Sequence, residues 1–481
     1  MGSSSTPGDR LRSGAVLERL VRGGLAYQAA SVLAGLIALG TLPLYTRFLT
    51  RAELGLAETL LTLIILASIL LRLGLQEALL RAWAQAPDRP ALARTVTTTV
   101  LLASTAAALL VALAAGPVSE ALLGERQPAL LRAAALGLWA FTNLEVANAL
   151  LRAEERRRTY LRASLANVLA TVGLTVLLVV VLERGAVGYL LGNYVASAAV
   201  LVALWVARPG VLGAPSVPLG PLVRFGAPTV PADATVFALN VVDRAWLVRA
   251  DSAAAAGVYA VAVKLATAVI VAARAFQAAW PPLAYGDADE RTYARVTTYY
   301  VAVVGCVVAA LALLARPLVD LLAADAFVPA HEALPWVALG WGLYGLFLVF
   351  VTIAGRARAT VRTLPPAVLG LAVNVAALAL LVEPLGPEGA GIALCASYVV
   401  MLVAARLLTR RLLAVPFERR RLATAVAVLT GAVVAGDAAL PEGAWAARAA
   451  LAAALPLALL ALDVIPRQDV AVARRRLRGA S

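Results

Sequence analysis

The chain has 481 residues, of which 62% are hydrophobic and only 15% are charged, and its mean hydropathy is +0.86. A soluble protein of this length would have several domains with polar surfaces, so the composition excludes that class. The formal net charge of +14 comes almost entirely from arginines in the loops between apolar runs, which excludes a nucleic-acid-binding protein because no solvated basic domain exists.

Apolar runs of about twenty residues follow one another from end to end, and each is long enough to cross a bilayer as a helix. The runs are continuous rather than alternating, which favours helices over the strands of a membrane barrel. The chain is therefore predicted to be an all-α integral membrane protein with about 14 transmembrane helices. The approximate limits of the spans are 24–46, 54–79, 95–117, 129–151, 161–183, 187–207, 226–248, 254–281, 296–316, 333–355, 364–383, 389–409, 422–440 and 444–464. Most connections are short, so neighbouring spans are expected to be antiparallel.

The two ends of the chain, residues 1–23 and the basic segment 466–481, are predicted to be cytoplasmic tails. The first apolar run is too long for the apolar core of a signal peptide, and no A-x-A-like site follows it, so it is predicted to be the first span. A Pro- and Gly-rich stretch, 208–225, is predicted to link two lobes. The other predicted parts are an N-lobe of spans 1–6 at 24–207, a C-lobe of spans 7–12 at 226–410, and spans 13–14 at 411–465.

Arginine is distributed unevenly between the two predicted faces of the membrane. The side of the N-terminus receives the arginine-rich segments 81–94, 152–162, 356–362, 406–421 and 474–478. The opposite loops are poorer in arginine and hold many of the acidic residues. By the positive-inside rule, the chain is expected in the inner (cytoplasmic) membrane with both termini in the cytoplasm, which agrees with an even number of spans.

An internal repeat relates the two predicted lobes. LVRGG at 20–24 matches LVRFG at 222–226, an offset of 202 residues (222 minus 20), and at this offset Arg47 aligns with Arg249 and Gly55 with Gly257. Each repeat holds an even number of spans, so the two lobes have the same orientation and are related by an axis along the membrane normal. Two like-oriented six-helix lobes around a central cleft, with two extra C-terminal helices, indicate an alternating-access carrier.

The chain resembles the polysaccharide flippases, which are the Wzx-type O-antigen and exopolysaccharide translocators of the multidrug/oligosaccharidyl-lipid/polysaccharide (MOP) exporter superfamily. The segments that carry the resemblance are LPLYTRFLTRAELGLAETLLTL (42–63), LRLGLQEALLR (71–81), VVDRAWLV (241–248), AAGVYAVAVKL (255–265) and GPEGAGIALCASYVV (386–400). The resemblance covers nearly the whole chain. One departure is Leu54-Gly55, where the family usually has an aromatic residue before the glycine.

The resemblance implies a transporter, not an enzyme, that moves a polyprenyl-diphosphate-linked oligosaccharide from the inner to the outer leaflet for cell-surface polysaccharide biosynthesis. Its partners would be this lipid-linked substrate and membrane lipids, with a glycan polymerase and glycosyltransferases as further candidates, and no nucleic acid. An ion gradient or the membrane potential would drive transport without a cofactor. In agreement, the nucleotide-binding pattern G-x-x-x-x-G-K-[ST] does not occur in the sequence.

Charged residues inside the predicted spans mark the candidate site, because a charge at the bilayer centre costs roughly 2.5 kcal/mol or more and usually faces a cavity. Cations suit a diphosphate, and the planar fork of arginine binds two phosphate oxygens at once. The candidate residues for binding the diphosphate and glycan are Arg47, Arg72, Arg244, Lys264 and Arg274. The candidate residues for ion coupling are Glu58, Glu145, Asp233 and Asp243.

Several of these residues have simpler alternative roles. Arg47 and Arg274 lie near span ends, where their side chains could extend to lipid headgroups. Asp243 and Arg244 could pair with local neighbours, and Glu145 could be a hydrogen-bonding residue in helix packing. These alternatives stay open on the sequence alone.

The deepest cations are Arg72 and Lys264, the only lysine of the chain. Glu58 and Arg72 are fourteen residues apart on the second span, close to four helical turns, so they are expected on nearly one face. Asp233 follows two prolines that would distort the start of span 7, a common feature of transporter sites. A cavity role is therefore favoured for Arg72 and Lys264.

Three other functions compete with this interpretation. A multidrug antiporter for organic cations would need an acidic cleft, whereas cations here balance or exceed acids. A flippase for the lipid-linked peptidoglycan precursor would share the span number and the cationic cleft. A membrane glycosyltransferase or ligase would need catalytic carboxylates in a sizeable loop, and Cys306, Cys395 and His331 form no catalytic or metal-binding pattern either.

Overall fold

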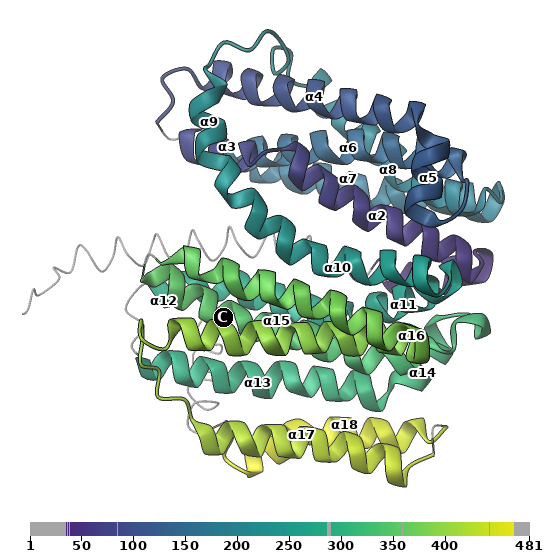
Figure 1. Cartoon of the computed structure of the whole chain (residues 1–481), viewed down its shortest axis with the longest axis vertical. Coiled ribbons are helices and arrows are strands. Elements are labelled where there is room, and N and C mark those ends of the chain that lie inside the picture. The colour runs from purple at the N-terminus through teal and green to yellow at the C-terminus, as the bar shows by residue number, and fades with distance from the viewer. Residues whose placement is uncertain are drawn as a thin grey trace, which may run out of the picture.

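The computed structural model shows a bundle of long helices that run roughly parallel or antiparallel to one another (Figure 1). It describes residues 39–83, 85–285, 290–357, 359–441 and 443–465, together with Gly35 and Ile37. The predicted tails and most of the first predicted span lie outside these residues. Within them every regular element is a helix, so the predicted all-α membrane fold is confirmed.

The first part of the chain forms one layer of the bundle, which we call the first helix group (purple to blue in Figure 1). After the end of the first span, its elements are α2 (Arg51–Leu71), α3 (Leu75–Trp83), α4 (Arg89–Leu113), α5 (Ala115–Leu123), α6 (Pro128–Ala153), α7 (Arg157–Val176) with the π turn η1 (Leu177–Val181), and α8 (Gly185–Val206). Local signals set the helix starts. Thr50 and Glu53 form a capping box at α2, and the Asp88 side chain accepts a hydrogen bond from the N–H of Ala91 at α4.

The second layer, the second helix group, follows in teal and green below the first in Figure 1. Its elements are α10 (Val230–Ala250), α11 (Ala253–Leu265), α12 (Thr267–Tyr285), α13 (Glu290–Leu313), α14 (Ala315–Leu322), η3 (Asp325–Phe327), α15 (Ala330–Arg356), η4 (Thr360–Thr363) and α16 (Leu364–Thr409). The axes of α11 and α12 differ by 51°, so this predicted span is broken in the middle.

The helix α16 folds back on itself and accounts for two predicted spans. Gly386 has φ 54° and ψ −128°, a left-handed conformation that glycine adopts without strain, and Pro384 and Pro387 flank it. The Nη1 of Arg362 donates to the carbonyl oxygen of Leu408 at 3.0 Å, so the beginning and the end of α16 lie at the same end of the bundle.

The predicted linker is bound to the first helix group. The N–H groups of Ser216 and Val217 donate to Oγ1 of Thr95 on α4 at 3.0 and 3.1 Å. The short helix α9 (Leu219–Gly226) follows, and its Leu222 packs in one buried cluster with Leu75 of α3. A single 3-10 turn, η2 (Ala227–Thr229), then leads into α10.

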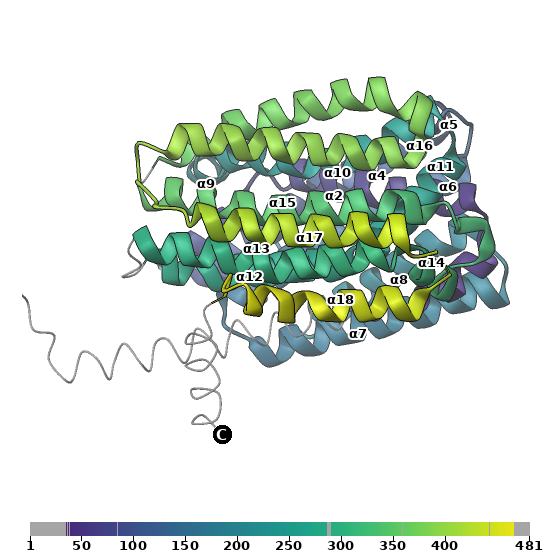
Figure 2. The ribbon, with the colours of Figure 1, turned by 90° about the horizontal axis from the view of Figure 1, so that it is seen from below.

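The last two helices, α17 (Arg419–Ala439) and α18 (Trp445–Ala461), pack beside α13 at the edge of the bundle (Figure 2). Arg448 is 5% exposed and joins them to the second helix group. Its guanidinium donates to the carbonyl oxygens of Leu313 on α13 at 3.1 Å and of Leu440 after α17 at 2.9 Å. These carbonyls end helices and would otherwise lack partners.

Nine helices of the described residues are long and apolar enough to cross a membrane, and the bent pair α11–α12 makes ten. The folded-back α16 counts once among them, α18 is shorter than the required length, and most of span 1 is outside the described residues. The chain is an integral membrane protein with many spans. The number 14 stays a prediction.

The two ends of the bundle differ in charge. We call them the Gly55 end, where α2 begins and where α5 and α14 lie, and the Arg72 end, where α2 finishes. Turns at the Arg72 end carry much of the arginine, in the segments 154–157, 207–208 and 410–411. Turns at the Gly55 end include the acidic residues Glu125, Glu183, Asp251 and Asp325. The asymmetry that predicted the orientation is therefore kept in the folded chain.

Candidate functional site

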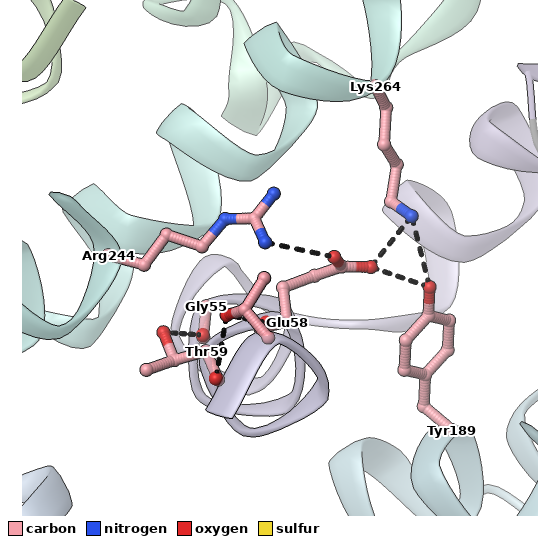
Figure 3. Close-up of polar contacts among 7 residues, drawn as sticks. Gly55, Glu58, Thr59, Tyr189, Arg244 and Lys264 are labelled. Carbon is pink, nitrogen blue, oxygen red and sulfur yellow. Dashed lines mark hydrogen bonds and ion pairs between the residues drawn. The ribbon is translucent and has the colours of Figure 1, made fainter. Parts of the chain in front are cut away.

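The carboxylate of Glu58 lies at the centre of a buried polar cluster between the two helix groups (Figure 3). Glu58 is 5% exposed. Its Oε1 lies 2.7 Å from Nζ of Lys264 and accepts a hydrogen bond of 2.7 Å from the hydroxyl of Tyr189. Nζ of Lys264 also donates to the Tyr189 hydroxyl at 3.2 Å, and Nη1 of Arg244 lies 4.0 Å from Glu58 Oε2.

Helix α2 brings Glu58 to this place through its first two turns. Thr59 and Thr62 direct their hydroxyls back to the carbonyl oxygens of Gly55 and Glu58, at 2.7 and 3.0 Å. Both hydroxyls are thus satisfied within the helix, as polar groups in an apolar setting must be. The Glu58 side chain is left to face the second helix group.

A glycine contact lets α2 and α11 approach closely beside this cluster. A Cβ atom on Gly55 would lie 1.9 Å from the carbonyl oxygen of Ala253, and one on Gly257 would lie 1.9 Å from that of Arg51. Only glycine fits at either position, so the pair forms a seam of backbone against backbone. The internal repeat had aligned these two glycines, and the structure shows that they meet.

The cluster is divided between the helix groups. Glu58 and Tyr189 come from α2 and α8 of the first group. Arg244 and Lys264 come from α10 and α11 of the second group. All contacts between the acid and the two cations therefore cross from one group to the other.

Arg244 is buried with an incomplete set of partners. The residue is 7% exposed, its ion pair among the described residues is the long one to Glu58, and its Nε makes no hydrogen bond. Buried guanidinium groups usually have all their donors satisfied and a close counter-charge. The arrangement leaves donors of Arg244 available to a further anion.

Asp243, the neighbour of Arg244 in sequence, belongs to a separate cluster. It is 1% exposed, and it accepts hydrogen bonds from the Tyr259 hydroxyl at 2.9 Å and from Nδ2 of Asn374 at 3.0 Å. All three residues lie in the second helix group. The amide oxygen of Asn374 makes no hydrogen bond to any part of the chain that the structure describes.

Arg72 lies at the other end of α2, apart from Glu58. It is the C-cap of α2, where its Nε donates to the carbonyl oxygen of Ser68 at 3.1 Å and its Nη1 bonds to Gln76. Nη1 also lies 3.7 Å from a carboxylate oxygen of Glu145 on α6. Arg72 and Glu145 thus form a second polar pair, within the first group and about 20 Å along the helix from Glu58.

The remaining candidates are exposed. Arg47 lies at the Gly55 end, and Asp233 and Arg274 lie on α10 and α12 of the second group. The structure brings none of the three into the Glu58 cluster. Arg249, the repeat partner of Arg47, instead crosses between the groups, because its Nη1 donates to the carbonyl oxygen of Glu120 in α5 at 3.2 Å.

The neutral members of the clusters were not predicted. Tyr189 and Tyr259 carry no charge, so a search for charges inside spans cannot find them. Asn374 could have been found, since it is a lone amide in the apolar run 364–383 and a buried amide requires partners. Arg249 could have been found from the repeat, which aligns it with Arg47.

Comparison with known proteins agrees with the resemblance seen in the sequence. A model of the polysaccharide biosynthesis protein family matches residues 20–284, which is more than half of the chain. No curated protein sequence matches the chain.

Several solved structures share the fold. The inward closed conformation of the lipid II flippase MurJ has a TM-score of 0.70 at 12% identity, over 90% of this chain and 98% of that chain. The inward-facing conformation of a multidrug resistance MATE family transporter of the MOP superfamily has a TM-score of 0.62 at 16% identity, over 83% and 95%. The bent form of the Vibrio cholerae MATE transporter VcmN has a TM-score of 0.54 at 16% identity, over 83% and 98%. These three solved structures that share the fold are a flippase and two transporters.

Proposed function

Because the chain belongs to the polysaccharide biosynthesis protein family and has the fold of MOP superfamily transporters, we propose that it is a flippase for a polyprenyl-diphosphate-linked oligosaccharide. The substrate would pass from the inner to the outer leaflet of the cytoplasmic membrane by alternating access, for cell-surface polysaccharide biosynthesis. The arginine-rich Arg72 end and both termini would face the cytoplasm. The Gly55 end would face outward.

Arg244 is the observation that carries this proposal. It is a buried guanidinium whose Nε makes no hydrogen bond to the described residues, it lies between the two helix groups, and Lys264 supplies a second cation to the same carboxylate. A phosphate fits a planar guanidinium fork beside an ammonium group, because it offers several acceptor oxygens. The diphosphate would therefore bind between Arg244 and Lys264, while the lipid tail stays in the bilayer.

The domain boundaries expected from the repeat fit this function. The N-lobe at 24–207 would contain the first helix group, and the C-lobe at 226–410 the second. The linker would be 208–225, and spans 13–14 at 411–465 would stand outside the repeat. Alternating access would then be a motion of the second group relative to the first.

The other candidate residues would have secondary roles. Arg72, Arg274 and Arg47 would meet the phosphates or acidic sugars on entry and exit, since they lie toward the two ends of the bundle. Asp243 is the strongest candidate for ion coupling, because it is a buried acid that forms no ion pair with the described residues. Glu145 and Asp233 would take part in ion coupling at the Arg72 end.

The test is transport of a fluorescent polyprenyl-diphosphate oligosaccharide in proteoliposomes under an applied ion gradient. Arrival in the opposite leaflet is measured with an impermeant glycosidase. Lys264→Met and Arg244→Met should each slow transport about tenfold or more, because a hydrogen bond to a charged group contributes about 1.5–3 kcal/mol. Arg316→Met is the control, since this half-buried arginine lies on α14, outside the Glu58 cluster, and forms an ion pair with Asp320 on the same helix.

Two results would contradict the proposal. One is a wild-type protein that does not move the lipid under a gradient of either sign. The other is transport at the wild-type rate by both Met variants, with the protein amount and the elution volume of each variant checked beforehand.

A flippase for the lipid-linked peptidoglycan precursor is the second candidate, because the structure of lipid II flippase MurJ covers nearly the whole chain. Both substrates carry a diphosphate, so the same pair of cations would serve either. Transport of lipid II faster than that of the oligosaccharide lipid, in the same proteoliposomes, would favour this candidate. A multidrug antiporter is less well supported, since two cations face a single carboxylate in the Glu58 cluster.

A further inference from the structure

Glu58 connects the helix groups at one level of the bundle, through contacts that a separation of the groups must break. Its bond from Tyr189 lies within the first group, whereas its ion pairs with Lys264 and Arg244 cross to the second. If the groups move apart, Glu58 retains its hydrogen bond from Tyr189 in the first group, and Arg244 and Lys264 remain together in the second group. Separation of the groups would therefore leave the acid in the first group and both cations in the second.

This ion-pair network is next to the seam. Glu58 is one helical turn from Gly55, and Lys264 lies on the same face of α11 as Gly257, seven residues away. Separation of the two helices at the seam would also lengthen the ion pairs. The glycine seam and the ion-pair network therefore close the same contact between the groups.

Two more contacts close the Gly55 end in the same way. The N–H of Ala324, after α14, donates to Oγ1 of Thr46 in the first span at 3.1 Å. Arg249 of α10 bonds to the end of α5, as described above. In contrast, Asp233 and Arg274 of the second group are exposed toward the Arg72 end. The groups are therefore closed at the Gly55 end.

The charges of Arg244 and Lys264 determine which kind of ligand could open the Gly55 end. Two cations left inside a membrane protein without an anion are strongly unfavourable, so the empty protein holds Glu58 in place. A phosphate brings several acceptor oxygens and can replace the carboxylate on both cations. The free Nε of Arg244 offers it a first contact before Glu58 leaves.

We propose, with the identity of the anion taken from the flippase function above, that Glu58 is a built-in anion that locks the Gly55 end. The phosphate of an entering substrate opens this end by taking Arg244 and Lys264 from Glu58. Tyr189 then holds the displaced carboxylate within the first group. When the substrate leaves, Glu58 recovers both cations and the end closes. Opening is thereby tied to a bound substrate.

The experiment measures the distance across the Gly55 end with two spin labels in proteoliposomes. The labels are attached at Leu122→Cys on α5 and Leu321→Cys on α14, which are 38% and 73% exposed and lie in opposite helix groups. Cys306 and Cys395 are replaced by alanine in every sample. This double-labelled protein is the parent, and pulsed electron paramagnetic resonance gives its distance distribution.

The lock predicts that Glu58→Gln moves the main distance peak of the parent to a longer value without any ligand. Lys264→Met breaks the same lock from the second group and should do so as well, so the result does not depend on the folding of one variant. Glu154→Gln is the matched control, because Glu154 pairs with Arg156 and Arg208 inside the first group at the other end. Its distances should equal those of the parent.

Displacement by phosphate predicts that farnesyl diphosphate lengthens the distance in the parent, whereas farnesol does not. In Glu58→Gln the diphosphate should add no further shift. Unchanged distances in both Glu58→Gln and Lys264→Met would overturn the lock, whatever the protein transports. Lengthening by these variants, but none of the parent by the diphosphate, would overturn the displacement. The transport assay separately decides the flippase function, so the two failures are distinguishable.

Discussion

Glu58 and Asp243 are two buried acids with similar local surroundings and different places in the architecture. Each accepts a hydrogen bond from a tyrosine, Tyr189 at 2.7 Å for Glu58 and Tyr259 at 2.9 Å for Asp243. Asp243 has its second partner, Asn374, in the same helix group. Glu58 has its cationic partners in the other group.

Of these two clusters, only the one around Glu58 can respond to a movement of the groups. A cluster inside one group moves with it and keeps its hydrogen bonds. A cluster between groups must exchange its partners when the groups move, so its energy depends on the conformation. Burial and hydrogen bonding alone do not separate the two kinds. The helices that supply the partners do.

The largest effect that tests this comparison is expected for Gly55→Val. The added side chain collides with backbone of α11, which cannot yield as a side chain would, so the seam should open at a loss of about 3 kcal/mol in stability. Thermal unfolding and the Leu122–Leu321 distance measure the two consequences. Gly431→Val on α17 is the matched control, because no atom lies within 4 Å of its added Cβ. Equal behaviour of the two variants would show that the seam does not hold the groups together.

A smaller effect is expected for Tyr189→Phe. Glu58 loses a hydrogen bond to its carboxylate but keeps Lys264, so stability should fall by about 1.5 kcal/mol. The Gly55 end should stay closed without substrate. With substrate, transport should slow, because the displaced carboxylate has lost its partner in the first group. The unfolding temperature of the variant measures the change in stability. Transport at the wild-type rate would show that Tyr189 has no part in the mechanism.

The smallest effect on stability is expected for Asp243→Asn, at less than about 1 kcal/mol. The amide oxygen of Asn374 is free, so a flip of that side chain lets it accept from the new amide while Tyr259 still donates. The distance across the Gly55 end should not change, since every partner lies in one group. A longer distance would show that Asp243 also controls the closure. Transport should lose its dependence on the applied ion gradient if Asp243 couples an ion.

Much of the fold was predictable because hydropathy and arginine bias act over whole spans. The sequence predicted an all-α membrane protein, a distortion at the start of span 7, and the alignment of Gly55 with Gly257 in the repeat. The bend between α11 and α12 and the fold-back of α16 at Gly386 each affect a single turn. Only the fold-back has a signal in the sequence, which is the pair of prolines that flank Gly386. The boundaries of the lobes stay predictions.

The site was predictable only in part. Glu58, Arg244 and Lys264 were named as candidates from their charge, but sequence could not show that they form one cluster, since α2 is far along the chain from the consecutive helices α10 and α11. The expected shared face of Glu58 and Arg72 did not bring them together, because α2 ends at Leu71 and Arg72 turns to Glu145. Contacts between helices depend on packing, which charge and periodicity do not specify.

The attachment of the linker to the first helix group has a mechanical consequence. Thr95 and Leu75 hold residues 216–222 to that group, so the chain gains its freedom only after α9, at the three-residue turn Ala227–Thr229. In the proposed alternating access, this turn would be the hinge between the groups, and α10 would be the arm that rotates about it. Arg244 lies fifteen residues along that arm from Thr229, so a small rotation at the hinge displaces its guanidinium by ångströms.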